Sequence, residues 1–462
     1  MKRFFKNAVA LLAVLAMLIC CCPFSALASD DSGLKFNNGK FKILILSDLQ
    51  DTDEPQQETV DMITSAITKT EPDLIVLLGD NIAGWWKGVD KAKTDEAIDV
   101  IGSTIEKSGV PFALVFGNHD HEGLASEENG YSEESAKEYI LHRFQLYGGC
   151  LAVEGEEMTG VGNYNLTIKD SNGEKDIFNL WFMDSNPYTS DEEGGGYGYV
   201  HEDQTEWYKS VSNELKEKNG GTPLPSLLFQ HIIVPEVYDM LTEVPKGTDG
   251  AVRGNGGHED KYYIANDEYI YQGSLNEGPC PPNVNHGQFD SWVEQGDIIG
   301  AFFGHDHTND FAGEYKGIKL VAVPGAGFYS YGGHHGVRTI TLDENNLTDF
   351  ESEIILSDDL LDYDVSNFYI ANHGYSEYKS VFLPAVFGTI GLVAVICVVV
   401  AAVIIIAKKK KAVTEKIKLS ITKKALISEP FYYTIQKSFF IVFAVICRNG
   451  INYRNNKAQN NE

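Results

Sequence analysis

Phe112-Ala113-Leu114-Val115-Phe116-Gly117-Asn118-His119-Asp120 is the stretch that decides the fold. Its first five residues are apolar and have the length and β-propensity of a buried strand. The polar residues Asn118, His119 and Asp120 follow at once. They therefore lie on a loop at a strand end, where a rigid backbone can aim side chains at one point.

Four further apolar runs end in polar clusters, in one order along the chain. The runs are 41–46, 74–78, 227–229 and 298–303. Their clusters are Asp48-Leu49-Gln50, Gly79-Asp80-Asn81, Gln230-His231 and Gly304-His305-Asp306-His307. A single cluster has an ordinary structural explanation, such as a turn for Gly-Asp. All five together favour a shared site, because imidazoles and carboxylates beside buried strands are costly unless something satisfies them.

These clusters supply the oxygen and imidazole ligands of a two-metal hydrolytic site. Asp80 is the natural bridging carboxylate, because Gly79 lets the chain turn sharply at the strand end. Asp48 would complete one metal, and Gln50 lies on the same side of an extended chain two residues on. Two cations about 3.5–4 Å apart can clamp a phosphoryl group and lower the pKa of a bridging water.

The other candidate ligands are an amide and three imidazoles. His305 and His307 obey the same period-two geometry, so one imidazole could serve each metal. Asn118 offers a neutral amide oxygen, and His231 offers a third imidazole. We expect two divalent metal ions as cofactors, with Mn, Zn, Fe and Mg as the candidates.

His119 has a different predicted role. It stands beside Asn118 but points elsewhere, which makes it the candidate general acid for the leaving oxygen. Asp120 is predicted to orient this imidazole and to keep it charged.

The spacing of the elements predicts a two-sheet α/β fold. The first part of the chain alternates strands at 41–46, 74–78 and 112–116 with helices near 56–69, 92–107 and 132–143, which indicates a mostly parallel sheet. The later part is richer in strands, expected at 163–169, 177–183, 226–230, 298–303, 318–323 and 336–342, with a helix near 203–218. The segment 234–295 is rich in Gly, Asn, Pro and Tyr and is interpreted as a long loop that covers the active site.

Both termini carry apolar stretches. Residues 1–28 have three basic residues, an apolar core and a small-residue cleavage pattern, so we expect a signal peptide rather than an uncleaved anchor. Residues 381–407 are uncharged and long enough to cross a bilayer, and four lysines follow. The expected topology is an extracellular domain, an acidic stalk at 358–380, one membrane span and a basic cytoplasmic tail at 408–462.

Charge excludes nucleic acid as an expected partner. The net charge of the chain is −29; residues 1–28 and 408–462 are basic, which leaves −41 for residues 29–407. So acidic a domain repels a nucleic-acid backbone. Of the seven cysteines only Cys150 and Cys280 lie in the expected extracellular domain, and an oxidising compartment permits a disulfide between them.

With these motifs the chain resembles the calcineurin-like metallophosphoesterase superfamily, within it the purple-acid-phosphatase-like branch. The superfamily pattern is Asp-x-His, Gly-Asp, Gly-Asn-His-Asp/Glu, a lone His and Gly-His-x-His. The resemblance implies a four-layer α/β/β/α sandwich in residues 29–357 with the dimetal site at the strand ends. It also implies the ligand sets: Asp48 and His307 for one metal, Asn118, His231 and His305 for the other, and Asp80 for both.

One departure from the pattern is Gln50, which stands where the family has the histidine of its first motif. An amide oxygen is a weaker ligand than an imidazole. The sequence predicts a surface-anchored phosphoesterase that hydrolyses phosphomonoesters by metal-activated hydroxide attack with His119 as acid. A phosphodiesterase with the same site is the alternative, and a non-catalytic surface binding module is the rival that Gln50 favours. The substrate beyond a phosphate ester and the oligomeric state stay open.

Overall fold

The computed structural model describes residues 32–363, except 87 and 332–333, together with residues 400, 404 and 405. The chain divides into two units, residues 1–384 and 385–462, and the description below concerns the first. The predicted signal peptide, nearly all of the span at 381–407 and the tail lie outside the described residues. In the part of the chain that is described, no helix is long and apolar enough to cross a membrane.

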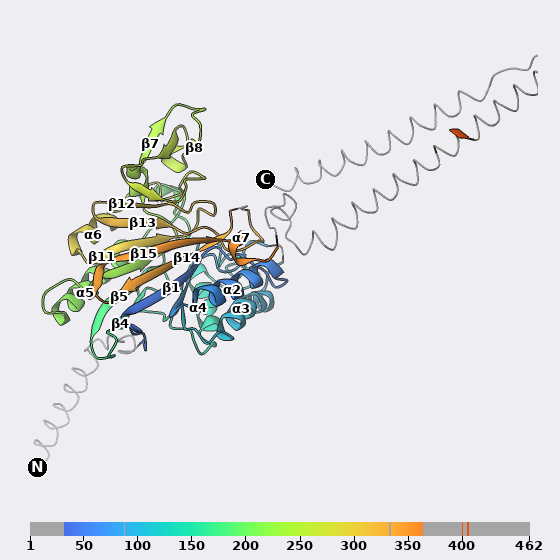
Figure 1. The fold of residues 1–462 in the computed structure, drawn as a ribbon. Coiled ribbons are helices and arrows are strands. Elements are labelled where there is room, and N and C mark those ends of the chain that lie inside the picture. The colour runs from blue at the N-terminus through green and yellow to red at the C-terminus, as the bar shows by residue number, and fades with distance from the viewer. Residues whose placement is uncertain (1–31, 87, 332–333, 364–399, 401–403, 406–462) are drawn as a thin grey trace, which may run out of the picture. The chain divides into compact units, whose positions relative to one another are not determined.

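Three sheets are present in these residues (Figure 1). A five-stranded sheet has the order β15-β14-β1-β2-β3, and a seven-stranded sheet has the order β10-β12-β13-β11-β6-β5-β4. A three-stranded sheet has the order β7-β9-β8. The strands are β1 Lys40–Leu46, β2 Leu74–Leu78, β3 Phe112–Val115, β4 Tyr164–Lys169, β5 Asp176–Phe182, β6 Ser226–Phe229, β7 Leu241–Val244, β8 Val252–Arg253, β9 Tyr262–Ala265, β10 Ile270–Gln272, β11 Ile298–Phe303, β12 Ala312–Tyr315, β13 Ile318–Ala322, β14 Gly336–Asp343 and β15 Asn346–Leu356.

The helices begin and end close to the predicted positions. The α-helices are α2 Gln57–Thr70, α3 Lys91–Glu106, α4 Glu133–Phe144, α5 Glu202–Lys218, α6 Gln288–Gln295 and α7 Ser357–Leu360. Three short 3-10 helices are η1 Asp191–Glu193, η2 Pro235–Met240 and η3 Gly256–His258. Side-chain N-caps define where two of these helices begin. The Asp90 carboxylate accepts a hydrogen bond from the Lys93 amide at the start of α3, and Ser132 forms a capping box with Ser135 at the start of α4.

The five-stranded sheet holds the first three ligand clusters at one edge. Strands β1, β2 and β3 are parallel, because the helices α2 and α3 return the chain to the same end each time. All five residues of β2 are buried, as expected for a central strand covered on both faces. The carboxyl ends of the three strands therefore bring the clusters of Asp48, Asp80 and Asn118 together.

The seven-stranded sheet is also covered on both faces, and its strands alternate between two cores. Leu180, Phe182 and Phe302 pack with β1, β2 and β3 in the core between the sheets. Their neighbours Trp181 and Phe303 pack in a second core with residues of α5 and α6. Helices α2, α3 and α4 lie outside the first sheet and α5 and α6 outside the second (Figure 1), which is the layered α/β fold that the sequence indicated.

The segment 234–295 is not a structureless loop, so that part of the interpretation was wrong. It contains η2, η3, α6, β10 and the whole three-stranded sheet, which projects from the top of the domain in Figure 1. Its later part does reach the fifth ligand cluster. The Glu277 carboxylate accepts a hydrogen bond from the Thr308 amide at 2.7 Å, and Asp306 accepts one from the Cys280 amide at 3.1 Å.

The predicted disulfide is also wrong. Cys150 and Cys280 are both free thiols. Cys150 bridges to Phe112 at the start of β3, whereas Cys280 contacts the loop that follows β11. Burial raises the pKa of the Cys150 thiol to about 12, so it is protonated and inert at neutral pH.

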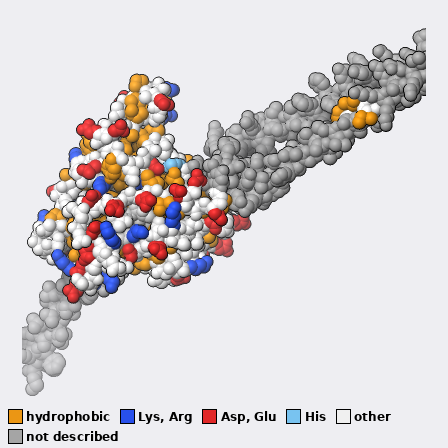
Figure 2. All heavy atoms as spheres, viewed as in Figure 1, with side chains coloured by type: hydrophobic (Ala, Val, Ile, Leu, Met, Phe, Trp, Pro, Cys, Tyr) orange, Lys and Arg blue, Asp and Glu red, His pale blue; other side chains and the backbone are white. Residues whose placement is uncertain are grey.

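The acidic charge of the domain is spread over its surface. Figure 2 shows Asp and Glu side chains interspersed with Lys and Arg over the face in view. Several of these form exposed ion pairs, such as Lys40 with Asp343 and Lys209 with Glu294. Exposed pairs of this kind add little stability, about 0–1 kcal/mol each, so the surface charge serves solubility more than folding.

Candidate metal centre

The five predicted clusters converge where the carboxyl ends of β1, β2, β3, β6 and β11 meet. Backbone hydrogen bonds fasten the loops to each other. The Asp48 amide donates to the Gly79 carbonyl at 3.1 Å, the Gln50 amide to the Asp80 carbonyl at 2.9 Å, and the Gly304 amide to the His231 carbonyl at 3.1 Å. The His305 amide also donates to Asp48 Oδ2 at 3.1 Å, which joins the loops of the two large sheets.

Strained backbone is concentrated in these loops. Asp48, Gln50, Asp80 and His305 have φ values of 50°, 40°, 48° and 70°, in the left-handed region that non-glycine residues rarely adopt. Each such residue costs of order 1–3 kcal/mol and persists only where the surroundings hold it. Four candidate ligands in this conformation indicate that the position of their side chains is under constraint.

Glycines make room for the ligands. A Cβ atom at Gly117 would collide with the Asp80 carboxylate, and one at Gly304 would collide with Ser47 and approach Asp48 Oδ2 to 2.7 Å. A Cβ at Gly79 would lie 2.6 Å from His231 Nδ1. Close approach therefore requires glycine in three of the five clusters, and at Gly79 a φ of 90° requires it as well.

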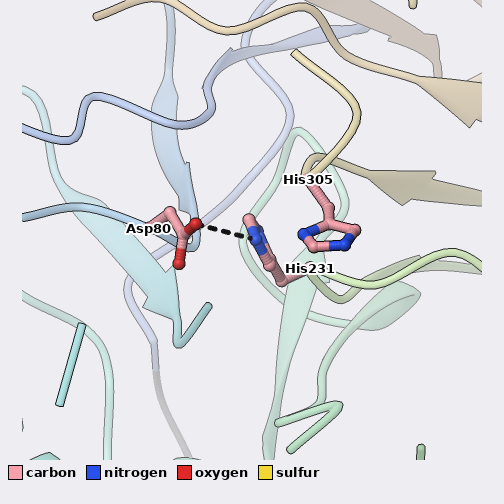
Figure 3. A group of neighbouring side chains, drawn as sticks. All are labelled: Asp80, His231 and His305. Carbon is pink, nitrogen blue, oxygen red and sulfur yellow. Dashed lines mark ion pairs between the residues drawn. The ribbon is translucent and has the colours of Figure 1, made fainter. Parts of the chain in front are cut away.

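The candidate ligand atoms form two groups that share Asp80. Asp80, His231 and His305 have donor atoms within 4.8 Å of one another, and so do Asp48, Asp80 and His307. His231 Nε2 lies 3.4 Å from Asp80 Oδ2, and His307 Nε2 lies 3.3 Å from Asp48 Oδ1. Figure 3 shows the Asp80 carboxylate directed at the His231 ring, with His305 next to that ring. Asp80 thus belongs to both groups, as the bridging carboxylate predicted from the sequence would.

Hydrogen bonds to the far ends of three ligands leave the metal-facing atoms available. His231 Nδ1 lies 2.9 Å from the Leu78 carbonyl, and His307 Nδ1 lies 3.1 Å from the Tyr331 carbonyl. These contacts favour a proton on each Nδ1 and leave Nε2 as the ligand atom. Asn118 Nδ2 donates to the Tyr188 hydroxyl at 3.0 Å, which leaves its Oδ1 for a cation.

The buried polar atoms fit a pair of cations. Five candidate ligand atoms are buried without a hydrogen bond: Asp48 Oδ1, Gln50 Oε1, Asn118 Oδ1, His231 Nε2 and His305 Nε2. Of these, Asp48 Oδ1 and His231 Nε2 have the ion-pair contacts of 3.3 and 3.4 Å given above. Each buried atom without a hydrogen bond costs about 1–3 kcal/mol unless something satisfies it. Carboxylate, amide and imidazole donors together suit divalent cations, so bound metal ions would remove this penalty at every one of these atoms.

Without metal ions, the buried carboxylates of the centre raise the pKa values of two of its three histidines, and the third has a lowered pKa. Burial opposes a charge on His231, but the carboxylates of Asp80 and Asp48 outweigh it and raise its pKa to about 10. Burial likewise opposes a charge on His307, and Asp48 raises its pKa to about 9. Burial and the neighbouring His231 lower the pKa of His305 to about 3, so this imidazole is neutral and ready to coordinate.

We expect the metal-free protein to lose stability as the pH rises from about 7 to 10. The folded-state pKa values of His231 and His307 lie above the ordinary value of 6.5. Their stabilising ion pairs are therefore fully present below about pH 6.5 and are lost as the pH rises through about 9 and about 10. Metal-loaded protein, in which both imidazoles are already neutral ligands, should lack this loss. Chemical unfolding across this pH range with and without a chelator should show a difference on the order of a few kcal/mol; identical curves would contradict the assignment of these histidines.

His119 stands apart from the ligands, as predicted, and its partner is Glu122. His119 Nδ1 lies 2.7 Å from Glu122 Oε2, and the His119 amide donates to Asp80 Oδ1 at 2.8 Å. Burial opposes a charge on the imidazole, but the hydrogen bond to Glu122 and the charge of Asp80 raise the pKa of His119 overall. A raised pKa favours the protonated ring, which is the form that a general acid requires.

The role predicted for Asp120 is wrong. Its carboxylate accepts hydrogen bonds from the backbone amides of Gly117 at 2.7 Å, Asn81 at 2.7 Å and Ile82 at 3.1 Å. Asp120 therefore holds the second and third clusters in register and does not orient His119. Burial, followed by repulsion from Asp80, raises the pKa of Asp120 to about 7.

Gln50 lies inside the centre with its amide nitrogen toward the bridging residue. Its Nε2 donates to Asp80 Oδ2 at 2.7 Å, while its Oε1 is one of the buried atoms without a hydrogen bond.

Gln50→His should raise the affinity for the first metal ion by about tenfold, because imidazole is the better donor for zinc, manganese or iron. Metal retained during dialysis against a graded chelator measures this, with Gln57→His on the exposed start of α2 as the control. Unchanged retention would show that position 50 is not a ligand position.

Comparisons with known proteins place all five clusters inside one matched region. The family profile of calcineurin-like phosphoesterases matches residues 41–309. An Arabidopsis thaliana protein described as probable inactive purple acid phosphatase 14 is 29% identical over 381 residues, covering 75% of this chain and 85% of that protein. Phosphatase DCR2 of Saccharomyces cerevisiae is 26% identical over 318 residues, covering 64% and 48% of the two chains. The structure of a dimetal phosphatase from Danio rerio covers 69% of this chain and 99% of its own at 14% identity, with a TM-score of 0.38.

Proposed function

This chain belongs to the calcineurin-like phosphoesterase family, and from that premise we propose that it hydrolyses phosphomonoesters at a dimetal centre with His119 as the general acid. One observation carries the proposal. Five buried donor atoms from the first, third, fourth and fifth clusters lack hydrogen-bond partners, and two groups of donors share the Asp80 carboxylate. Such an arrangement is costly in a protein that holds no ions there.

The residues divide the work of the reaction. Asp48 and His307 would hold one cation, Asn118, His231 and His305 the other, and Asp80 both. Cations bound there supply charge that stabilises the phosphoryl oxygens and lowers the pKa of a water. His119 gives its proton to the leaving oxygen, and Glu122 keeps the imidazole oriented through Nδ1, which leaves Nε2 to carry the transferred proton.

The rival function is a binding module without catalysis. Gln50 in place of a histidine favours it, and so does the description of the Arabidopsis thaliana relative as probably inactive. The pairing of His119 with Glu122 beside the ligands weighs against it, because a module that only binds has no use for a proton donor.

Two measurements separate the candidates. Elemental analysis of the purified protein should give near two metals per chain, and phosphate should be released from p-nitrophenyl phosphate faster than p-nitrophenol is released from the bis ester. Faster cleavage of the bis ester would favour the phosphodiesterase. Metal-loaded protein that cleaves neither ester would favour the binding module.

We also propose that the domain is displayed on the outside of the cell by one C-terminal span. The support is sequence alone: an uncharged apolar stretch at 381–407 followed by Lys408 to Lys411, and a signal-peptide pattern at 1–28. Protease added to intact cells should remove the domain and leave the membrane-bound tail. A domain protected until the cells are lysed would overturn the topology.

A further inference from the structure

Exposed aromatic rings gather around the metal centre. Between residues 32 and 363, the large apolar side chains that the structure shows as exposed are Trp85, Leu146, Tyr188, Tyr271, Val284, Val293, Tyr329 and Tyr331. Three of them, Trp85, Tyr188 and Tyr331, contact residues of the centre, and a fourth, Tyr329, lies next to Trp85. We call these four rings, together with the half-buried Tyr197, the aromatic rim.

Two members of the aromatic rim lie beside the proposed acid. The Trp85 ring meets the His119 ring at a centroid distance of 4.6 Å and an interplanar angle of 63°. The centroid of the Tyr329 ring lies 6.4 Å from that of Trp85. Trp86, the next residue, is buried instead, with 9% of its surface exposed against 41% for Trp85. Of these two tryptophans, Trp85 is therefore the exposed one, and its ring lies against the His119 ring.

The other three rings contact metal ligands. Tyr331 stacks on His307 at 4.1 Å and 8°, and Tyr197 meets His305 edge-on at 4.3 Å. Tyr188 accepts the hydrogen bond from Asn118 and stacks with Tyr197 at 6.0 Å. Among the candidate ligands, the rim thus contacts Asn118, His305 and His307.

Neither folding nor charge pairing explains this exposure. A ring that leaves 40–57% of its surface in water forfeits hydrophobic stabilisation that burial would give. Contiguous exposed apolar surface of this kind marks a site of binding. The charged side chains that hydrogen-bond to the rim are the carboxylates Glu122, to Tyr188 at 3.4 Å, and Glu277, to Tyr331 at 3.1 Å, so the rim favours a group without negative charge.

We propose that the leaving group of the substrate carries an uncharged planar ring, an aryl group or a nucleobase, which packs on Trp85. The inference rests on the proposed function and sharpens it. His119 must lie within reach of the leaving oxygen, and Trp85 contacts His119, so the group attached to that oxygen meets the indole. A planar ring gains both apolar contact and offset or edge-to-face packing there, whereas an alkyl group of equal size gains only contact.

A matched pair of substrates tests the proposal. Benzyl phosphate and cyclohexylmethyl phosphate have leaving alcohols of similar acidity and size, so the chemical step is nearly equal and only the planarity differs. Metal-loaded wild-type protein should hydrolyse the benzyl ester with a kcat/KM about 5–10-fold higher. Trp85→Ala should bring the ratio near one with two metals still bound, and Tyr329→Ala should lower it in part.

Control variants separate the ring contact from general damage. Trp85→Phe keeps a ring and should keep most of the preference. Tyr271→Ala removes a ring on β10 that is more exposed than Trp85, 56% against 41%, and should leave the ratio unchanged. Equal hydrolysis of both esters by the wild type, or an unchanged ratio in Trp85→Ala, overturns this inference alone. Metal-loaded protein that releases phosphate from neither ester overturns the proposed function, and this inference with it.

Discussion

Asp80→Ala is expected to empty the centre of both metals and to lower phosphate release by roughly 10³-fold or more. Asp80 belongs to both donor groups, so its removal takes a ligand from each cation at once. The change also leaves the His119 amide and the Gln50 amide without their acceptors, since these donate to Asp80 Oδ1 and Oδ2. Elemental analysis of the purified variant, alongside its rate of phosphate release, measures both effects.

Two controls make the result specific. Asp80→Asn keeps the size and one acceptor of the side chain but not its charge, and it should also lose metal because a neutral amide bridges cations poorly. Asp349→Ala removes a carboxylate on β15 that pairs with Lys319 and should keep both metals. Retention of two metals per chain in Asp80→Ala would end the assignment of this residue as the bridge.

His119→Ala should behave differently, with turnover reduced by about 10²–10⁴-fold and metal content unchanged. His119 contributes no atom to either donor group, and its ring is in part exposed while the ligands are buried. The loss should be largest for esters with poor leaving groups, which need the proton, and small for p-nitrophenyl phosphate. Loss of metal in this variant to the same extent as in Asp80→Ala would show that the two roles are misassigned.

Glu122→Gln offers a finer test of the same acid. The Glu122 carboxylate is one of the causes that raise the pKa of His119, so a neutral amide there should lower it. A general acid works only while protonated, and activity therefore falls as the pH rises through its pKa. The alkaline limb of kcat should move to lower pH in Glu122→Gln. A limb that stays in place while kcat falls would indicate only a structural role for Glu122.

Most residues of the centre could be predicted from the sequence, because each ligand cluster lies directly after a strand that the sequence itself indicates. Each ligand cluster follows an apolar run of strand length, and the helices between the first three runs require parallel strands whose ends meet. The structure brings together Asp48, Gln50, Asp80, Asn118, His231, His305 and His307, and keeps His119 beside them. The boundaries of β2 and β11 coincide with the predicted runs.

The His119–Glu122 pair, strand β15 and the aromatic rim were not predicted, because they depend on how the chain is arranged in space and not on a local pattern of residues. In the turn after β3 the neighbours His119 and Asp120 point apart, while Glu122, three residues on, returns to the imidazole. The spacing His-x-x-Glu could have signalled this pair. Strand β15 escaped prediction because only Phe350 and Ile355 among its eleven residues are buried, so it carries little apolar pattern. The aromatic rim joins loops far apart in the chain, and no spacing predicts that.

The origin of the ligands has a consequence for how the protein matures. The five-stranded sheet presents Asp48, Asp80 and Asn118, all oxygen donors, and the seven-stranded sheet presents His231, His305 and His307, all nitrogen donors. Ions held between them would act as a cross-link that joins the two halves of the domain. Neither half alone offers all the donors of either proposed metal site, so a nascent chain could not complete the pair of sites before residue 307 has been synthesised and folded. Cation uptake would then be the final step that locks one sheet against the other.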